Sequence, residues 1–279
     1  MKFIDSNVQE LFFSLYICAM KIPFSKYHGT GNDFIIIDNR ELGWQPSQEE
    51  IAYLCDRHFG IGADGLMLLS EKPGFDFYMT YYNSDGREST MCGNGGRCMI
   101  IFAKSLSLTA NEPHFLAIDG EHTGKVEKTG DTPVVSLKMK DVTVSESDAD
   151  HLFMDTGSPH YVVFKKNVED IDLIREARLI RFNERFSEEG TNVDFVGIGK
   201  KGLYVRSYER GVENETLSCG TGVTASALAF AVKNPPCSFV EVHTRGGALS
   251  VSFRQDGNSF TYIWLKGPVQ FVFQGEVVV

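Results

Sequence analysis

The sequence predicts an α+β protein of two similar, pseudo-symmetric domains, each a curved, mostly antiparallel sheet or barrel around a buried central helix. Two observations lead to this fold class. A cysteine in a glycine-rich loop occurs at 91–95 (MCGNG) and, 127 positions later, at 218–222 (SCGTG). An apolar or small-residue run follows each loop, at 99–103 and 225–231. A segment that is apolar nearly all round is typical of a helix buried on every side.

Three further segments recur in the same order at nearly the same offset. These pairs are 30–36 with 156–163, 63–66 with 193–196, and 77–83 with 203–209. A solenoid repeats every 20 to 50 residues or so, so this long period indicates two related domains instead. A pseudo-twofold axis between them would bring Cys92 and Cys219 face to face in the interdomain cleft, where ligand sites preferentially lie.

The remaining elements are predicted in chain order. A helix is expected at 48–55 behind the cap residue Ser47. Residues 120–133, dense in Gly, Asp, Thr and Lys, are interpreted as the crossing between domains. A second helix should stop before the Asn234-Pro235-Pro236 sequence. β-Branched and aromatic content predicts strands at 22–24, 34–38, 66–69, 75–82, 115–119, 134–139, 161–164, 194–198, 203–208, 240–244, 248–253 and 260–264.

These elements divide the chain into a first domain at 21–131 and a second at 132–267. The final strand, 268–279, lies outside the repeat and is expected to return to the first domain. Residues 1–20 are interpreted as an N-terminal extension, with Met20 as the natural start. Their apolar run is too short to span a bilayer, and acidic residues precede it. The alternative is an export signal, which would predict disulfides in an oxidising compartment.

Composition excludes several classes of function. The chain has 279 residues, long enough for two domains, with 42% hydrophobic and 23% charged residues, as in soluble globular proteins. Its formal net charge of -10 argues against nucleic acid as a partner, because phosphate binding needs clustered Lys and Arg. We therefore expect a reduced, cytoplasmic protein with neither a nucleic-acid nor a membrane partner.

Two motif matches are rejected on physical grounds. Residues 60–65 (GIGADG) fit the dinucleotide pattern, but a predicted strand follows where that fingerprint needs a helix. Cys92 and Cys98 are six residues apart, unlike the cysteine pairs of structural zinc sites, so we expect no metal. The cysteines without a repeated partner are interpreted as small apolar residues: Cys18, Cys55, Cys98 and Cys237.

Cys92 and Cys219 are predicted to be functional because each begins a helix. Unpaired amides and the positive helix end favour a thiolate, bring the thiol pKa towards neutrality and bind carboxylates. The alternatives are two buried thiols or a disulfide between the domains. The surrounding glycines favour close approach of a ligand to the backbone, and a disulfide would be an inactive state. Two such sites suggest paired acid and base thiols acting on one anionic small molecule.

Several motifs together resemble the diaminopimelate epimerases, which do not use pyridoxal phosphate. Asn94 and the Glu209-Arg210 pair separate the chain from proline racemases, in which a His typically occupies the Asn94 position. The resemblance runs from about Ile22 to the C-terminus. Its motifs are 28–34 (HGTGNDF), 57–65 (RHFGIGADG), 83–86 (NSDG), 91–95, 209–211 (ERG) and 218–222.

The resemblance implies stereoinversion of L,L-2,6-diaminopimelate to the meso form, in lysine and peptidoglycan precursor biosynthesis. Inversion through a planar carbanion requires a base on one face and an acid on the other. Cys92 and Cys219 would be this pair, assisted by His160 and Glu209, and the sequence leaves open which is the base for the L,L isomer. The resemblance also implies a homodimer acting on a small amino acid without cofactor or metal. The implied substrate-binding residues are Asn32, Asn83, Gly93, Asn94, Ser158, Asn192, Glu209, Arg210, Gly220 and Thr221.

Two departures from the family pattern concern the end of the pocket that would hold the distal amino acid group. Ser158 stands where the family word Gly-Asn-Pro-His has Asn, and Gly65 stands where some members carry Gln. Both shorten the reach of the protein. Epimerisation or racemisation of another amino acid therefore remains an alternative. A non-catalytic redox or ligand-binding protein that uses the cysteine pair as a disulfide switch is another.

Overall fold

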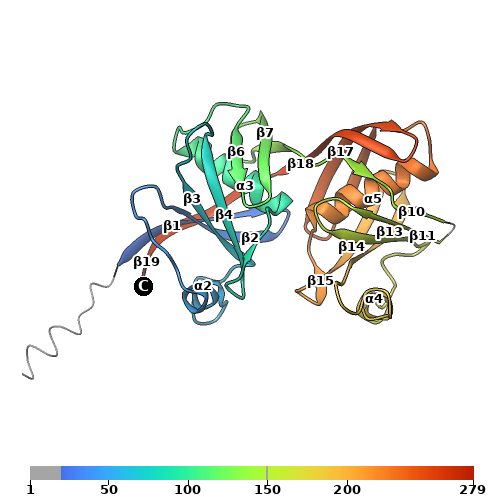
Figure 1. The fold of residues 1–279 in the computed structure, drawn as a ribbon, viewed down its shortest axis with the longest axis horizontal. Helices are drawn as coiled ribbons and strands as arrows, with labels where there is room; N and C mark the ends of the chain where they lie inside the picture. The colour runs from blue at the N-terminus through green and yellow to red at the C-terminus, as the bar shows by residue number, and fades with distance from the viewer. Residues whose placement is uncertain (1–19, 149) are drawn as a thin grey trace, which may run out of the picture.

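The computed structural model describes residues 20–148 and 150–279. The predicted extension at 1–19, with Cys18, lies outside these residues. Figure 1 shows two lobes side by side, each with one helix, α3 (Gly93–Ser105) or α5 (Gly220–Lys233), wrapped by curved strands. The fold is α+β with two pseudo-symmetric halves, as predicted from the repeat.

The first lobe contains, among the described residues, the strands β1 to β7 and the C-terminal strand beside β1. Two of its pairings are parallel, β2 with β3 and β4 with β6, and the others are antiparallel. Its second helix, α2 (Gln48–Cys55), lies outside the sheet (Figure 1). The strands are β1 (Lys21–Gly29), β2 (Asn32–Asp38), β3 (Gly65–Ser70), β4 (Phe77–Asn83), β5 (Glu88–Ser89), β6 (His114–Ala117) and β7 (Gly120–Lys128).

The second lobe repeats this pattern. β12 is parallel to β13 and β14 is parallel to β16, in the same order as in the first lobe. The matching pairings confirm the pseudo-symmetry. The helix α4 (Leu173–Arg181) takes the place of α2. The strands are β11 (His151–Asp155), β12 (Pro159–Phe164), β13 (Asn192–Gly199), β14 (Gly202–Glu209), β15 (Asn214–Thr216), β16 (Phe239–Thr244) and β17 (Gly247–Asp256).

Strands that cross between the lobes make one continuous, curved and unclosed sheet. β8 (Val134–Lys138) pairs with β7 on one side and with β18 (Ser259–Pro268) on the other. The short β9 (Val142–Thr143) also pairs with β18, and β10 (Glu146–Ser147) pairs with β11. β19 (Gln270–Val278) runs antiparallel to β1, the first strand of the chain. The boundary between residues 131 and 132 stays a prediction.

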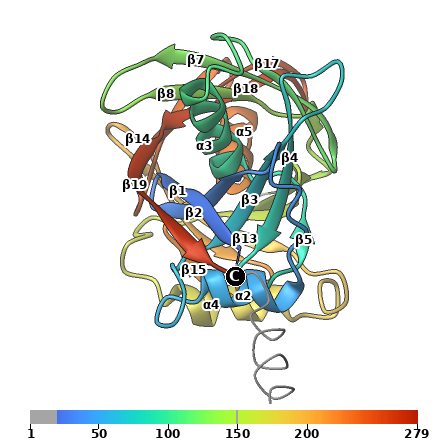
Figure 2. The same cartoon turned by 90° about the vertical axis from the view of Figure 1, so that its left-hand side faces the viewer.

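One apolar core runs through both lobes and encloses the two central helices. Figure 2 shows α3 inside the curved sheet, with α5 behind it. Inward residues of β4 alternate along the strand, with Phe77, Met79 and Tyr81 buried against the core. Each helix therefore has a fixed depth and direction, and its N-terminus faces the junction between the lobes.

Local sequence explains α2. The hydroxyl of Ser47 accepts from the amide of Glu50, whose carboxylate accepts from the amide of Ser47, a complete capping box. Ile51 and Leu54 bury the inner side of the helix. The predicted helix boundaries are confirmed.

Several short strands (β5, β9, β10, β11 and β15) were not predicted, and two larger elements also differ from the sequence expectations. Residues 120–128 form β7 and are not a loop: a Cβ on Gly124 would lie 2.3 Å from Cδ1 of Ile100, so this glycine permits close packing on α3. The helix α4 was not predicted. Leu173 and Ala177 are buried in it, and Ile174 and Ile180 pack against the same cluster. This apolar spacing at 173, 174, 177 and 180 was the signal in the sequence.

Two excluded classes can be compared with the structure. Residues 65–70 form a strand, so the GIGADG segment is not followed by the helix of a dinucleotide site. Among the described residues, no helix is both long and apolar enough to cross a membrane.

Candidate active site

The two repeated cysteines cap the two central helices. Cys92 is the N-cap residue of α3 and Cys219 that of α5, each with extended backbone angles. The two helix starts touch, since a Cβ on Gly220 would lie 3.3 Å from the Cα of Gly93. Glycine at both positions lets the backbones approach this closely. The structure thus brings together the helix N-termini, and with them the amides of Gly93, Gly220 and Thr221.

Asn94 joins the two cysteine loops. Its Nδ2 atom donates to the carbonyl oxygen of Ser218 at 2.9 Å and to Oδ1 of Asn32 at 3.2 Å. The same Oδ1 atom lies 3.6 Å from Sγ of Cys92. Asn94 is fully buried. A residue of the first lobe therefore fastens the loop that carries the thiol of the second lobe.

A chain of hydrogen bonds leads inward from Cys219. Its Sγ atom lies 3.3 Å from Oγ1 of Thr221, which lies 2.9 Å from Nε2 of His160. Nδ1 of His160 lies 2.7 Å from Oδ2 of Asp194, and Ser207 donates to the other carboxylate oxygen at 2.6 Å. His160 and Asp194 are fully buried. The imidazole is thus held in one orientation against the Cys219 thiol.

Asn192 gathers the other predicted residues of the second lobe. Its Nδ2 atom donates to Oγ of Ser158 at 2.8 Å and lies 3.4 Å from Nε2 of His160. Its Oδ1 atom accepts from the backbone amide of Arg210 at 2.9 Å. The guanidinium of Arg210, an exposed residue, donates to the carbonyl of Glu189. The Ser158 hydroxyl therefore contributes to this cluster despite its short reach.

Glu209, the last residue of β14, acts electrostatically on both thiols. Burial raises the pKa of its carboxyl group, while a hydrogen bond from the Thr216 hydroxyl acts in the opposite direction. Its negative charge in turn raises the pKa of Cys92 and of Cys219. The charge of one carboxylate therefore opposes ionisation of both cysteines.

The thiols are less acidic than the sequence suggests. Burial raises the pKa of Cys92 to about 11, although the amides of Gly95 and Asn94 act in the opposite direction. Burial also raises the pKa of Cys219, and the carboxylates of Glu209 and Asp194 add to this rise. The expectation that the helix termini bring both thiols towards neutrality is therefore wrong, because burial outweighs the amides.

Asn83 is a predicted site residue that pairs, at the end of β4, with Gly65 of β3. It ends β4 and is exposed. Within residues 20–148 and 150–279, no hydrogen bond joins its side chain to another site residue. Its place at the end of β4 mirrors that of Glu209 at the end of β14.

Sequence reasoning missed Tyr81, which occupies the space beside Gly65. A Cβ on Gly65 would lie 2.6 Å from Cε2 and 3.1 Å from the hydroxyl of Tyr81. Tyr81 is buried. Among the described residues its hydroxyl has no hydrogen-bond partner, but the hydroxyl oxygen keeps some exposure to solvent. Burial, followed by the charges of Cys92 and Glu209, raises its pKa. The signal in the sequence was the apolar alternation at 77, 79 and 81.

An ion-pair network behind Asn32 was also missed. Asn32 donates to Oδ2 of Asp64 at 2.7 Å. Arg57 bridges Asp64 and Asp33, with both contacts at 2.7 Å, and the ammonium of the buried Lys26 lies 2.8 Å from Asp33. These residues come from three separate segments, and they fix the turn that carries Asn32 beside Cys92.

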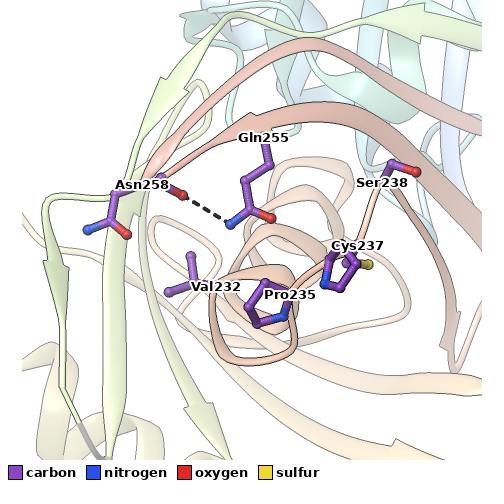
Figure 3. Close-up of a pocket in the computed structure, with 8 residues that line it drawn as sticks. Val232, Pro235, Cys237, Ser238, Gln255 and Asn258 are labelled. Atoms are coloured by element: carbon purple, nitrogen blue, oxygen red, sulfur yellow. Dashed lines mark hydrogen bonds between the residues drawn. The ribbon is translucent and has the colours of Figure 1, made fainter.

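Among the described residues, the cysteines outside the repeat make no hydrogen bond to a site residue. Cys55 and Cys98 are buried, as predicted for small apolar residues. Cys237 is half-buried and lines a cavity of about 770 Å³ with Pro235, Gln255 and Asn258 (Figure 3). This cavity lies beyond the C-terminal end of α5, at the opposite end of that helix from Cys219. It is therefore separate from the cysteine pair.

Metal-binding groups were sought over the same part of the chain. No cluster of three or more His, Cys, Asp or Glu side chains that could hold a metal ion occurs among residues 20–148 and 150–279. Both Cys92 and Cys219 are free thiols. The polar groups described above for the site are thiols, hydroxyls, amides, one imidazole and carboxylates.

Known proteins share this architecture. Solved structures similar to the chain include a phenazine biosynthesis protein of the PhzF family from Bacillus anthracis, with a TM-score of 0.71 at 15% identity, covering 93% of this chain and 100% of that one. A hydroxyproline epimerase from Agrobacterium vitis has a TM-score of 0.71 at 14% identity, covering 93% of each chain. At these identities the similarity shows the fold alone.

Sequence comparisons identify the family. The family model for Diaminopimelate epimerase matches twice, over residues 24–144 and 152–272, once in each half. A diaminopimelate epimerase from Flavobacterium psychrophilum is 47% identical, covering 90% of this chain and 98% of the relative. One from Chlorobaculum tepidum is 39% identical, covering 89% and 98%. The chain therefore belongs to the diaminopimelate epimerase family, and it is an isomerase.

Proposed function

We propose that the protein interconverts L,L- and meso-diaminopimelate by a two-base mechanism with Cys92 and Cys219 as the thiolate and thiol pair. The observation that carries this proposal is the contact between Gly93 and Gly220, which brings the two cysteine-capped helix starts together. The product serves lysine and peptidoglycan precursor biosynthesis. Each half of the protein supplies one proton carrier, so the substrate α-carbon lies between them.

The helix N-termini supply the electrostatic part of the mechanism. The first amides of α3 and α5, at Gly93, Asn94, Gly220 and Thr221, have no partner within their own helices. They hold the substrate α-carboxylate and stabilise the negative charge that develops on it as the α-proton leaves. Asn32, Asn83, Ser158, Asn192 and Arg210 bind the remaining carboxylate and amino groups.

His160 and Glu209 accept the proton that a cysteine thiol must lose to become the thiolate base. Because a carboxylate only accepts, the bond to Asp194 places the proton of His160 on Nδ1 and leaves Nε2 to accept. The Thr221 hydroxyl then donates to Nε2, and the Cys219 thiol donates to Thr221. This order of donors leads a proton from Cys219 towards His160. Glu209, whose pKa is raised by burial, exchanges a proton on the same side.

Each of the two domains contributes one cysteine of the pair. The first domain comprises residues 21–131, completed by strand β19, and contributes Cys92. The second comprises residues 132–267 and contributes Cys219. The pair works only as free thiols, so we assign the protein to the cytoplasm, where thiols stay reduced. No metal or organic cofactor takes part in this chemistry.

A homodimer is supported by the exposed face of β19. This strand pairs with β1 and, within residues 20–148 and 150–279, with no other strand. It exposes three consecutive apolar residues, Phe271, Val272 and Phe273. An edge strand of this kind is normally covered in the working protein. Sedimentation velocity should show a dimer that Phe271→Glu converts to monomer, and a monomeric wild-type protein would contradict this assignment.

Hydrogen exchange at the α-carbon tests the proposed reaction. The reduced protein is incubated in deuterated water with a panel of amino acids, and α-deuteration is followed by mass spectrometry. Exchange should occur with L,L-diaminopimelate and should be lost in Cys92→Ser and Cys219→Ser. Cys237→Ser is the matched control, since this half-buried thiol lies at the far end of α5.

The other outcomes separate the alternatives. Exchange with a different amino acid alone would show a related epimerase or racemase with another substrate. An absence of exchange with every compound under reducing conditions would contradict both enzymatic functions. It would favour a redox or ligand-binding role for the cysteine pair.

A further inference from the structure

Arg97 is a fully buried cation in the first turns of α3. Its Nη1 atom donates to the carbonyl of Gly93 at 3.1 Å and its Nη2 atom to Oδ1 of Asn94 at 2.9 Å. Its Nε atom has no partner, and no carboxylate among residues 20–148 and 150–279 forms an ion pair with it. Arginine is almost never fully buried unless it is paired with an anion. The guanidinium must therefore have a function that compensates for its burial.

The surrounding backbone fixes this guanidinium in place. A Cβ on Gly29 of β1 would lie 3.2 Å from Nη2. A Cβ on Gly267 of β18 would lie 3.2 Å from both Nε and Nη2. Both strands therefore approach the guanidinium closely because these residues are glycines. Since β18 also pairs with β8, Arg97 lies where the sheets of the two lobes join.

The first consequence concerns the orientation of Asn94. An amide side chain has one accepting and one donating end, and the bond from Arg97 assigns the accepting end. The donating end of Asn94 is then directed to the carbonyl of Ser218 and to Oδ1 of Asn32. Arg97 thus determines the contact between the Cys219 loop and the residue beside Cys92.

The second consequence concerns charge. Burial lowers the pKa of Arg97, while negative charge on Cys98 or Cys92 acts in the opposite direction. A guanidinium keeps its proton in proteins. Cys98 packs inside the apolar core, whereas Cys92 caps α3 and is one of the two proposed proton carriers, so Cys92 is the neighbour that ionises in the reaction. The other titratable groups that face Cys92 are Glu209 on β14 and Tyr81 on β4, and neither offers it a positive charge.

We propose that Arg97 is a positioning residue of the two-thiol site. Its guanidinium group fixes Asn94 between the two cysteine loops, and its positive charge stabilises the Cys92 thiolate. Among the described residues, Arg97 makes no hydrogen bond to either thiol and acts through Gly93 and Asn94. The electrostatic part stands on geometry, because the guanidinium bonds the carbonyl of Gly93, the residue that follows Cys92. The kinetic part rests on the proposed function, because it requires α-proton exchange as its readout.

The alkylation rate of Cys92 tests whether the positive charge of Arg97 stabilises the Cys92 thiolate. The rate of modification by iodoacetamide, measured by peptide mass spectrometry at about pH 8, reports the thiolate fraction. Arg97→Met should slow modification about tenfold, because losing a nearby positive charge raises a thiol pKa by about one unit. Arg97→Lys keeps the charge and should stay near the wild-type rate. The matched control is Lys104→Met, which removes one positive charge from the same helix near its C-terminal end.

Turnover of L,L-diaminopimelate tests the two hydrogen bonds that the Arg97 guanidinium donates. A lysine cannot reproduce the two bonds to Gly93 and Asn94, so Arg97→Lys should lower kcat about tenfold with little change in KM. Near-ultraviolet circular dichroism checks that each variant is folded. If Arg97→Met does not fold, Arg97→Lys still decides the outcome, since a folded lysine variant with wild-type kcat overturns the positioning role.

Each failure has a distinct meaning. A folded Arg97→Met variant that is alkylated at the wild-type rate overturns the electrostatic role, whatever the activity of the protein. A wild-type protein without α-exchange would overturn the proposed function, while the alkylation rates would still report on Arg97.

Discussion

Nδ1 of His160 lies 2.7 Å from Oδ2 of Asp194, and both side chains are fully buried. This contact sets the tautomer of the imidazole, because the carboxylate accepts the Nδ1 proton and leaves Nε2 as an acceptor. Thr221 connects that acceptor with the Cys219 thiol. A carboxylate that touches neither thiol thus decides how one of them exchanges its proton.

Asp194→Asn should therefore lower kcat by about 100-fold or more with a smaller effect on KM. The new amide can donate to Nδ1, which moves the imidazole proton to Nε2 and turns the acceptor into a donor. Initial rates of α-deuteration measure the effect. Ser207→Ala is the control, because it removes a hydrogen bond to Asp194 without changing the tautomer. An asparagine variant as active as the control would contradict the relay.

Thr221→Val should lower kcat by about tenfold or more, because the methyl group breaks the link between Cys219 and His160. Thr221→Ser retains the hydroxyl and should keep most of the activity. The comparison is informative because valine and threonine have the same shape. Equal kcat values for the valine and serine variants would show that the hydroxyl transfers no proton.

Tyr81→Phe should raise the KM for L,L-diaminopimelate about threefold to tenfold, the value of one hydrogen bond to the ligand. Its hydroxyl is unpaired among the described residues, so the unfolding free energy should stay close to that of the wild type. Tyr78→Phe on the same strand is the control, since that ring points away from the core. A loss of stability without a change in KM would assign Tyr81 to the core alone.

Asp33→Asn should destabilise the protein by about 3 kcal/mol, because it leaves the buried Lys26 without its carboxylate. Burial alone would raise the pKa of Asp33, but hydrogen bonds from Arg57 and Lys26 outweigh it and lower the pKa from 3.8 to about 2. A lowered pKa gives stability that is complete above 3.8 and is lost as the pH falls through about 2. The lowered pKa of Asp33 contributes about 2 kcal/mol to the free energy of unfolding.

Urea unfolding at a series of pH values checks this prediction. The wild type should lose the Asp33 contribution between about pH 4 and pH 2, and the asparagine variant should lack that part of the slope. Asp85→Asn provides the comparison, since its carboxylate is largely exposed. Identical slopes for Asp33→Asn and the wild type would show that the ion pairs around Asn32 contribute no stability.

The sequence predicts the parts of the fold that depend on local pattern or on the repeat. The runs after Cys92 and Cys219 are apolar on all sides, which only a buried helix explains. Ser47 with Glu50 marks the start of α2. Residues 120–128 were wrongly predicted as a loop, because a glycine that permits close packing on a helix, such as Gly124, cannot be told from a loop glycine in the sequence.

The site was predicted where motifs carry it and missed where strand pairing creates it. Asp194 reaches His160 only because β12 and β13 are parallel neighbours. Tyr81 lies beside Gly65 because β3 and β4 pair, and Arg97 lies under Asn94 because the two share a helix turn. The thiol pKa values were misjudged because burial depends on the whole fold, whereas the helix terminus is a local feature.

The central claim is that the two lobes supply one proton carrier each to opposite faces of a single carbon. Its most direct test is the early distribution of deuterium when the wild-type protein acts on L,L-diaminopimelate in deuterated water. With two bases, the meso product should carry solvent deuterium while the recovered L,L substrate carries almost none. Deuterium appearing at equal rates in recovered substrate and product would mean that one group serves both faces, and it would contradict the claim.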